Sequence, residues 1–122
     1  KIMRYADVLL IAAEAAARNN QDDVAQGYLN QLVTTRDPSS AGYNSTGDEL
    51  IKDIVLERRK ELAFEGDRLG DLNRLKWPIV RTGAGYPPGT ELIAADDLRR
   101  MLPIPQAEVD ANARIEQNEA YK

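Results

Sequence analysis

The 122-residue chain contains no cysteine and no histidine. Without these two residue types, disulfides, thiol nucleophiles, Ser-His-Asp triads and the usual zinc sites are excluded. The formal net charge of -4 argues against general binding of nucleic acid, which requires a basic surface. The sequence also lacks an apolar run near the ~18 residues of a membrane-spanning helix. Its length suits a single domain that can bury a core without covalent cross-links.

Two helices are predicted at the start of the chain. Apolar residues at spacings of three and four indicate a helix over about Ile2–Arg18. Ile11 lies among polar residues on its other side, so we expect more than one face of this helix to be covered. A second helix should be capped by Asn20 and should end before Asp37, which precedes a proline. The apolar stripes are Ile2, Tyr5, Leu9, Ala12, Ala13 and Ala16 on the first helix, and Ala25, Tyr28, Leu29 and Leu32 on the second.

Two further helices follow a polar turn region. Thr46 and Glu49 have the spacing of a capping box, which predicts the start of a third helix. Gly66 fits a left-handed helix stop, and Asp67 can cap a short fourth helix. These helices are predicted over about Asp48–Glu65 and Asp67–Lys76.

We predict an all-α fold, with antiparallel helix pairs in residues 1–76 that form a fragment of an α-solenoid. The first pair resembles one tetratricopeptide unit, which is a weak signal for a lone repeat. Glycines and prolines predict a long loop over residues 77–97. Residues 98–122 are predicted to form an extended tail that lies across the helices. Its contacts would come from Met101, Leu102 and Ile104.

The third and fourth helices carry many charges. One face of the third begins with Leu50 and Ile54 and becomes ionic toward its end. Its glutamates stand four residues apart and resemble a catalytic or metal-binding row. Neighbouring arginines would hold these acids ionised instead of raising the pKa of one of them. We therefore predict no catalytic or metal-binding residue, but a structural ionic network. Its members are Glu57, Arg58, Glu61, Glu65, Arg68, Asp71 and Arg74.

Trp77 and Tyr86 are the candidate ligand-binding residues. Sugars present flat C–H faces that stack on aromatic rings, and their hydroxyl groups need polar partners nearby. The same loop offers such partners in Arg81, Thr82, Thr90 and Glu91. In the alternative interpretation, Trp77 only covers the end of a helix and Tyr86 anchors a turn.

Three stretches resemble motifs of the SusD/RagB family. The sequence ERRKELAFEGDRLGDLNR, from Glu57 to Arg74, is similar to the family signature ERR-x-EL-x-FEG-x-R-x-x-DL-x-R. The stretch RYADVLLIAAEA, which begins at Arg4, resembles a helix of the family. The stretch LPIPQAEVDANA, from Leu102, together with QNEAYK resembles the family's terminal segment. The chain has Ala113 where the family has a proline. It has Glu119-Ala120 where the family has Pro-Gly.

The resemblance implies a non-catalytic glycan-binding lipoprotein of the outer membrane, without a cofactor. Such proteins capture oligosaccharides at the cell surface for a TonB-dependent, SusC-like transporter. Helical periodicity begins almost at Lys1, so we expect the chain to be an excerpt, with any lipid anchor on sequence that precedes it. The resemblance further implies that Arg68 and Arg74 join the third helix to the fourth and to the tail. Most glycan contacts in the family lie upstream of the matching region.

Two other functions remain as alternatives. A solenoid adaptor that binds proteins or peptides is favoured only by the repeat-like helix pair. A carbohydrate-cleaving enzyme would use the acids of the third helix. The resemblance favours glycan capture, with this segment acting mainly as scaffold and as a surface that docks the transporter.

Overall fold

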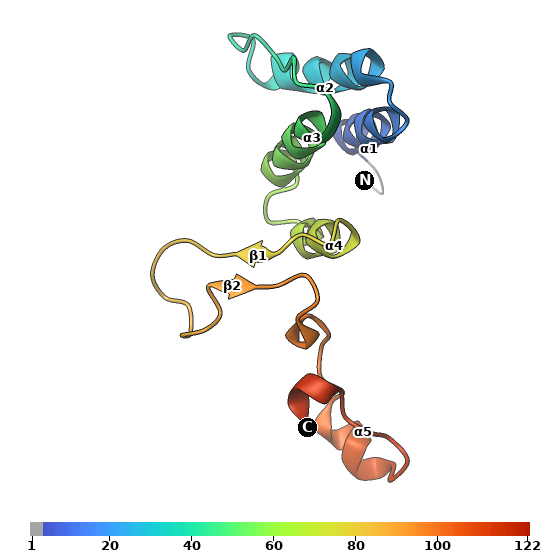
Figure 1. Ribbon diagram of the computed structural model, residues 1–122, viewed down its shortest axis with the longest axis vertical. Coiled ribbons are helices and arrows are strands. Elements are labelled where there is room, and N and C mark those ends of the chain that lie inside the picture. Colours follow the sequence, from blue (N-terminus) through green and yellow to red (C-terminus); the bar gives the residue numbers. More distant parts are fainter. Residues whose placement is uncertain (1–3) are drawn as a thin grey trace. The chain divides into compact units, whose positions relative to one another are not determined.

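The computed structural model describes residues 4–122 and divides into two compact units (Figure 1). The first, which we name the helical unit, ends at Arg68, and the second, the hairpin unit, begins at Leu69. Among the described residues, no helix combines the length and the apolarity needed to cross a membrane. Ile2, which was assigned to the first helix, lies outside the described residues.

The helical unit begins with an antiparallel hairpin of α1 (Tyr5–Arg18) and α2 (Asp22–Arg36). The predicted cap at Asn20 is wrong, because Asn20 has a φ of 57° and lies in the turn. Gln21 precedes the first residue of α2, and its side chain makes no capping hydrogen bond. The predicted end of α2 before Asp37 is confirmed. The turn is therefore closed by a left-handed residue and not by a side-chain cap.

The connection between α2 and α3 (Gly47–Glu61) runs back along α2. The Asn30 side chain donates to the Tyr43 carbonyl at 2.9 Å and accepts from the Tyr43 amide at 2.6 Å. At the far end, the Gly47 amide donates to Asp22, in the first turn of α2, at 3.0 Å. This return path places the starts of α2 and α3 together, so the two helices run parallel to each other.

The core of the helical unit lies where α1, α2 and α3 meet. Leu10, Leu29, Leu50 and Ile54 are fully buried, with 0% of their surface exposed. Small residues on α1 and α2, such as Ala13 and Ala25, are equally buried. Alanine at these positions allows the helix backbones to approach closely.

Parts of the predicted apolar stripes lie outside this core. Tyr5 is 67% exposed and Tyr28 is 39% exposed. Ile11, expected to be covered, is 53% exposed. The helical unit therefore retains apolar surface on the outer faces of α1 and α2.

The third helix ends at Glu61, four residues earlier than predicted. Phe64 and Gly66 both adopt positive φ values, 66° and 90°, and this left-handed backbone cannot continue a right-handed helix. Gly66 therefore has the predicted left-handed conformation, but it lies five residues beyond the last residue of α3. Phe64 points into solvent and is fully exposed. Thr46 does precede the first residue of α3, although its side chain makes no capping bond.

Helix α4 (Asp67–Arg74) ends two residues before the predicted boundary, and most of it, from Leu69 on, belongs to the hairpin unit. Lys76, with a φ of 53°, turns the chain away from the helix. The segment predicted as a loop contains an antiparallel pair of two-residue strands, in which Ile79 faces Ile93. The tail contains three short helical elements. These elements are β1 (Ile79–Val80), β2 (Leu92–Ile93), η1 (Leu98–Arg100), α5 (Gln106–Ala111) and η2 (Glu119–Tyr121).

The tail closes on itself. The side chain of Gln117 donates to the Ile104 carbonyl and accepts from the Ile104 amide, both at 2.9 Å. Asn118 donates to the Leu102 carbonyl at 2.5 Å. Within the hairpin unit, Leu102 is 82% exposed and Met101 is 49% exposed. The LPIP motif and the QN motif of the tail therefore form hydrogen bonds with each other.

Gly42→Ala should lower the free energy of unfolding by about 1–3 kcal/mol. The φ of +75° disfavours a Cβ atom, which would also lie 2.6 Å from Oδ1 of Asn30. Gly27→Ala is the matched control on the surface of α2, where an added Cβ has nothing within 4 Å. It should raise stability by about 0.5–1 kcal/mol, because alanine favours a helix interior over glycine. Urea unfolding measures both changes, and equal stability of the two variants would contradict the packing of the connection against α2.

Candidate functional site

The ends of three helices meet at four charged residues, Arg4, Arg36, Glu61 and Glu65, which we name the helix-end junction. Arg36 donates through Nε and Nη2 to the two carboxylate oxygens of Glu61, at 2.9 and 2.7 Å. Arg4 Nη2 donates to the backbone carbonyl of Glu61 at 3.0 Å and contacts Glu65 at 2.8 Å. The Glu61 side chain is only 11% exposed. Its pKa is lowered, chiefly by the hydrogen bonds from Arg36, so the carboxylate stays ionised.

A second buried charge joins α3 to α1. Arg58 is 9% exposed, and its Nη1 donates to Oδ1 of Asp7 at 2.9 Å. A guanidinium at this depth requires a carboxylate, because an unpaired charge in the interior is strongly unfavourable. Asp7 therefore fixes where α1 contacts the second half of α3.

Glu57 contacts the connection between α2 and α3. The Tyr43 hydroxyl donates to Glu57 at 2.6 Å, and Lys60 donates to the same oxygen at 2.5 Å. Burial raises the pKa of Tyr43, and its hydrogen bond to Glu57 raises it further. The tyrosine is thus a neutral donor at ordinary pH, and its ring packs the connection against the core.

Each of the seven residues predicted for the ionic network takes part in polar or electrostatic contacts. In the helical unit, the three glutamates and Arg58 bind residues that were not among the seven predicted members of the network. On α4, Asp71 is 5% exposed and pairs with Arg74 at 2.8 Å. Arg68 also makes an interaction. The missed partners are Arg4, Asp7, Arg36 and Tyr43.

Two clefts adjoin the helix-end junction and share Arg36 and Glu61 as lining residues. The Tyr5 cleft, of about 440 Å³, lies between the start of α1 and the end of α2. The Tyr43 cleft, of about 570 Å³, lies between the connection and α3. The lining of the Tyr5 cleft includes Tyr5, Leu9, Gln31, Leu32 and Thr35, and that of the Tyr43 cleft includes Tyr43, Glu57 and Lys60.

The predicted aromatic pair lies in the hairpin unit. Trp77 is half-buried, and its backbone carbonyl accepts from Arg100 at 2.7 Å. Tyr86 is 45% exposed, and the Arg81 guanidinium lies 5.4 Å from the centre of its ring. Arg81 also donates to the Thr90 carbonyl at 3.1 Å. The structure therefore brings together three of the residues predicted around the ligand, whereas Trp77 is held by a different partner.

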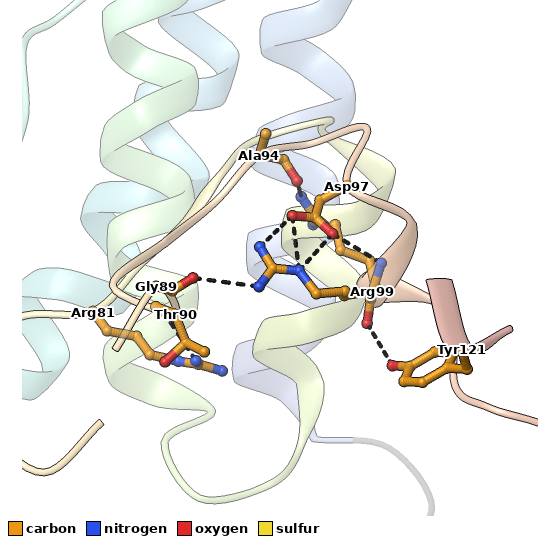
Figure 2. Close-up of polar contacts among 8 residues, drawn as sticks. Arg81, Gly89, Thr90, Ala94, Asp97, Arg99 and Tyr121 are labelled. Carbon is orange, nitrogen blue, oxygen red and sulfur yellow. Dashed lines mark hydrogen bonds and ion pairs between the residues drawn. The ribbon is translucent and has the colours of Figure 1, made fainter. Parts of the chain in front are cut away.

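A forked ion pair closes the base of this loop (Figure 2). Asp97 accepts from Nη2 of Arg99 at 2.6 Å and from the Arg99 backbone amide at 2.9 Å. Arg99 in turn donates to the Gly89 carbonyl at 3.3 Å, while its own carbonyl accepts from the Tyr121 hydroxyl at 3.2 Å. These contacts join the loop to the end of the tail. The side-chain hydrogen bond from Arg99 lowers the pKa of Asp97 to about 2.

No group of three or more metal-ligating side chains occurs among residues 4–122. Glu57 and Glu61, the acids in the last turns of α3, are engaged by arginine, lysine or tyrosine. These contacts hold Glu61 ionised, whereas a general acid in glycoside cleavage requires a raised pKa. The geometry therefore favours orientation of helices over proton transfer.

Arg58→Ala should lower the free energy of unfolding by about 1–3 kcal/mol, because the Asp7 carboxylate, whose side chain is 30% exposed, would lose its partner. Arg59→Ala, at the exposed neighbouring position, should change it by less than about 0.5 kcal/mol. Thermal and urea unfolding measure the difference between the two arginines. Near-wild-type stability of Arg58→Ala would rule out a structural role for the buried pair.

The Asp97 carboxyl should titrate at about pH 2 in the folded protein. Because this pKa lies below the ordinary value of 3.8, the stability that the pair contributes is complete above about pH 4 and is lost as the pH falls through 2. Nuclear magnetic resonance of the carboxyl carbon measures the pKa directly. In Arg99→Gln it should return toward 3.8, and an unchanged value in that variant would contradict the assigned cause.

The sequence and the structure both match known proteins. Residues 1–121 match the SusD family. The chain is 36% identical to SusD-like protein P2 of Formosa agariphila, over 95% of this chain and 24% of that protein. It thus spans about a quarter of the length of that relative.

Two solved structures are similar to this one. A SusD superfamily protein from Bacteroides thetaiotaomicron is 39% identical with a TM-score of 0.82, and the match covers 96% of this chain and 27% of that one. A SusD-like carbohydrate binding protein from Bacteroides vulgatus is 42% identical with a TM-score of 0.60, over 71% of this chain and 18% of the other. With the family matched from residue 1 to residue 121, the chain belongs to the SusD family.

Proposed function

We propose that this chain is part of a non-catalytic protein that captures oligosaccharides at the cell surface. The protein would be a lipoprotein of the outer membrane and would deliver its ligand to a TonB-dependent, SusC-like transporter. The observation that carries this proposal is the match to the SusD family along nearly the whole chain. The similarity to a solved SusD-like carbohydrate binding protein supports the class of ligand.

The first role proposed for this segment is that of a scaffold. Paired charges at the helix-end junction and at Arg58 have restricted geometry, because each guanidinium must stay on its carboxylate. Such pairs orient helices more than they add stability. An ionised, paired Glu61 also argues against acid catalysis, which supports a protein that binds sugars without cleaving them.

The second role is partner docking. Phe64 is fully exposed and has a φ of 66°, which is unfavourable for a residue with a large side chain. Aromatic residues, phenylalanine among them, are enriched at protein–protein interfaces relative to the rest of the surface. We assign the turn at Phe64 to the surface that contacts the transporter.

The loop between β1 and β2 is proposed as an edge of the glycan site. Tyr86 is held by Arg81 yet remains 45% exposed, so part of its ring is open to a sugar. The Thr90 carbonyl and Arg81 are already bonded to each other, which keeps the loop in one conformation. A preformed loop binds with a smaller loss of conformational entropy than a flexible one.

The alternative of a solenoid adaptor has less support. The α1/α2 hairpin alone resembles a repeat, whereas α3 runs parallel to α2 after a connection that returns along it. Arrays of helix hairpins stack successive helices in alternating directions, so this connection departs from their pattern.

Titration with a panel of neutral oligosaccharides should quench the fluorescence of Trp77, the only tryptophan, in a saturable way for one sugar class. Tyr86→Ala should remove the response, and Tyr28→Ala, at an exposed tyrosine of α2, is the matched control. A flat response from folded protein would remove the loop from the glycan site and leave scaffold and docking. Release of new reducing ends from any sugar in the panel would contradict the non-catalytic function itself.

A further inference from the structure

We propose that the Tyr5 cleft binds a neutral sugar unit of an oligosaccharide, a site separate from the Trp77 and Tyr86 loop. The inference rests on the proposed function for its ligand class, but its evidence lies in the helical unit. The cleft has a volume of about 440 Å³, within the range of ~300–1,000 Å³ that is typical of small-molecule sites.

The cleft has an aromatic platform. Tyr5 lies in the first turn of α1 and is 67% exposed, an unusually open position for a residue of the helix's apolar stripe. Its hydroxyl accepts from Nε2 of Gln31 on α2 at 3.2 Å, which restrains the ring. A restrained, open ring can stack against the C–H face of a sugar with little loss of conformational entropy.

The polar groups around this ring offer both donors and acceptors. Since the Tyr5 oxygen accepts from Gln31, its own proton remains available to a ligand. The Thr35 hydroxyl donates to the Gln31 backbone carbonyl at 2.6 Å, and its oxygen can still accept. Arg36 binds Glu61 through Nε and Nη2, and among the described residues nothing accepts from its Nη1. Each sugar hydroxyl both donates and accepts, so this mixture suits a polyol.

The charges of the cleft favour a neutral ligand. Arg36 is matched by Glu61, and Arg4 is matched by Glu65 just outside the lining. Neither an anion nor a cation would find an unbalanced charge to bind. Buried Leu9 and Leu32 form an apolar floor, which can receive the C–H groups of a pyranose ring.

The Tyr43 cleft gives a longer chain somewhere to continue. Both clefts are lined by Arg36 and Glu61, so a sugar chain that leaves the Tyr5 cleft would pass over this ion pair. Beyond it lies Lys60, whose side chain is 57% exposed beside Glu57. The ligand is therefore assigned as an oligosaccharide of several units, with its tightest contact at Tyr5.

Isothermal titration calorimetry tests the site with maltotetraose, cellotetraose, xylotetraose and mannotetraose, and with penta-alanine as a non-carbohydrate probe. At least one tetrasaccharide should bind. Tyr5→Ala should weaken that binding at least tenfold and Tyr5→Phe about threefold, since Tyr5→Phe removes only the hydroxyl. Tyr28→Ala is the matched control and should bind like the wild type. Lys60→Ala should weaken the tetrasaccharide but not the corresponding disaccharide.

The outcomes separate this site from the proposed function. Wild-type affinity in folded Tyr5→Ala overturns the site, even where Tyr86→Ala abolishes binding and the capture function stands. Binding of penta-alanine alone, or of no tetrasaccharide, also overturns the site. Equal unfolding temperatures of Tyr5→Ala and Tyr28→Ala exclude a folding defect as the cause of lost affinity. Cleavage of a tetrasaccharide would overturn the non-catalytic function, whichever residue the sugar binds.

Discussion

The arrangement of the helical unit depends on the contacts that Glu61 makes with Arg36 and Arg4. The ends of α2 and α3 lie together because the two helices run parallel, and the carboxyl end of each helix carries a partial negative charge. Glu61 adds a full negative charge at the same place. Arg36 and Arg4 compensate for all three, and they come from α2 and from the residue before α1. Two arginines thereby hold the ends of three helices around one carboxylate that is largely shielded from solvent.

Local features of the fold could be predicted from the sequence because they depend on neighbours in the chain. Apolar spacing located α1 and α2, the spacing of Thr46 and Glu49 located the start of α3, and the Asp37-Pro38 pair located the end of α2. The end of α3 was predicted too late, since residues 62–65 read as helical in composition. Only the left-handed backbone at Phe64 distinguishes them, and phenylalanine gives no signal for it. The short β1/β2 pair was missed because two residues per strand leave no alternating pattern.

In the candidate sites, too, single residues could be recognised from the sequence, whereas their distant partners could not. The charged residues of α3 were recognised, but their partners lie up to 57 positions away in sequence, and no local pattern joins Arg4 to Glu61. Tyr86 was identified by its residue type and its loop, and it is exposed as a platform would require. Tyr5 was assigned to an apolar stripe, because periodicity cannot separate a core position from one at the open edge of a cleft.

The ion pair between Asp7 and the buried Arg58 also has a consequence for the order of folding. These residues are 51 positions apart, so the pair cannot form until the whole connection has returned along α2. The α1/α2 hairpin needs only a short turn and can form from local contacts. Closing a long loop has an entropic cost that must be met before its contacts form. We therefore expect docking of α3, which brings Arg58 to Asp7, to be slower than formation of the α1/α2 hairpin.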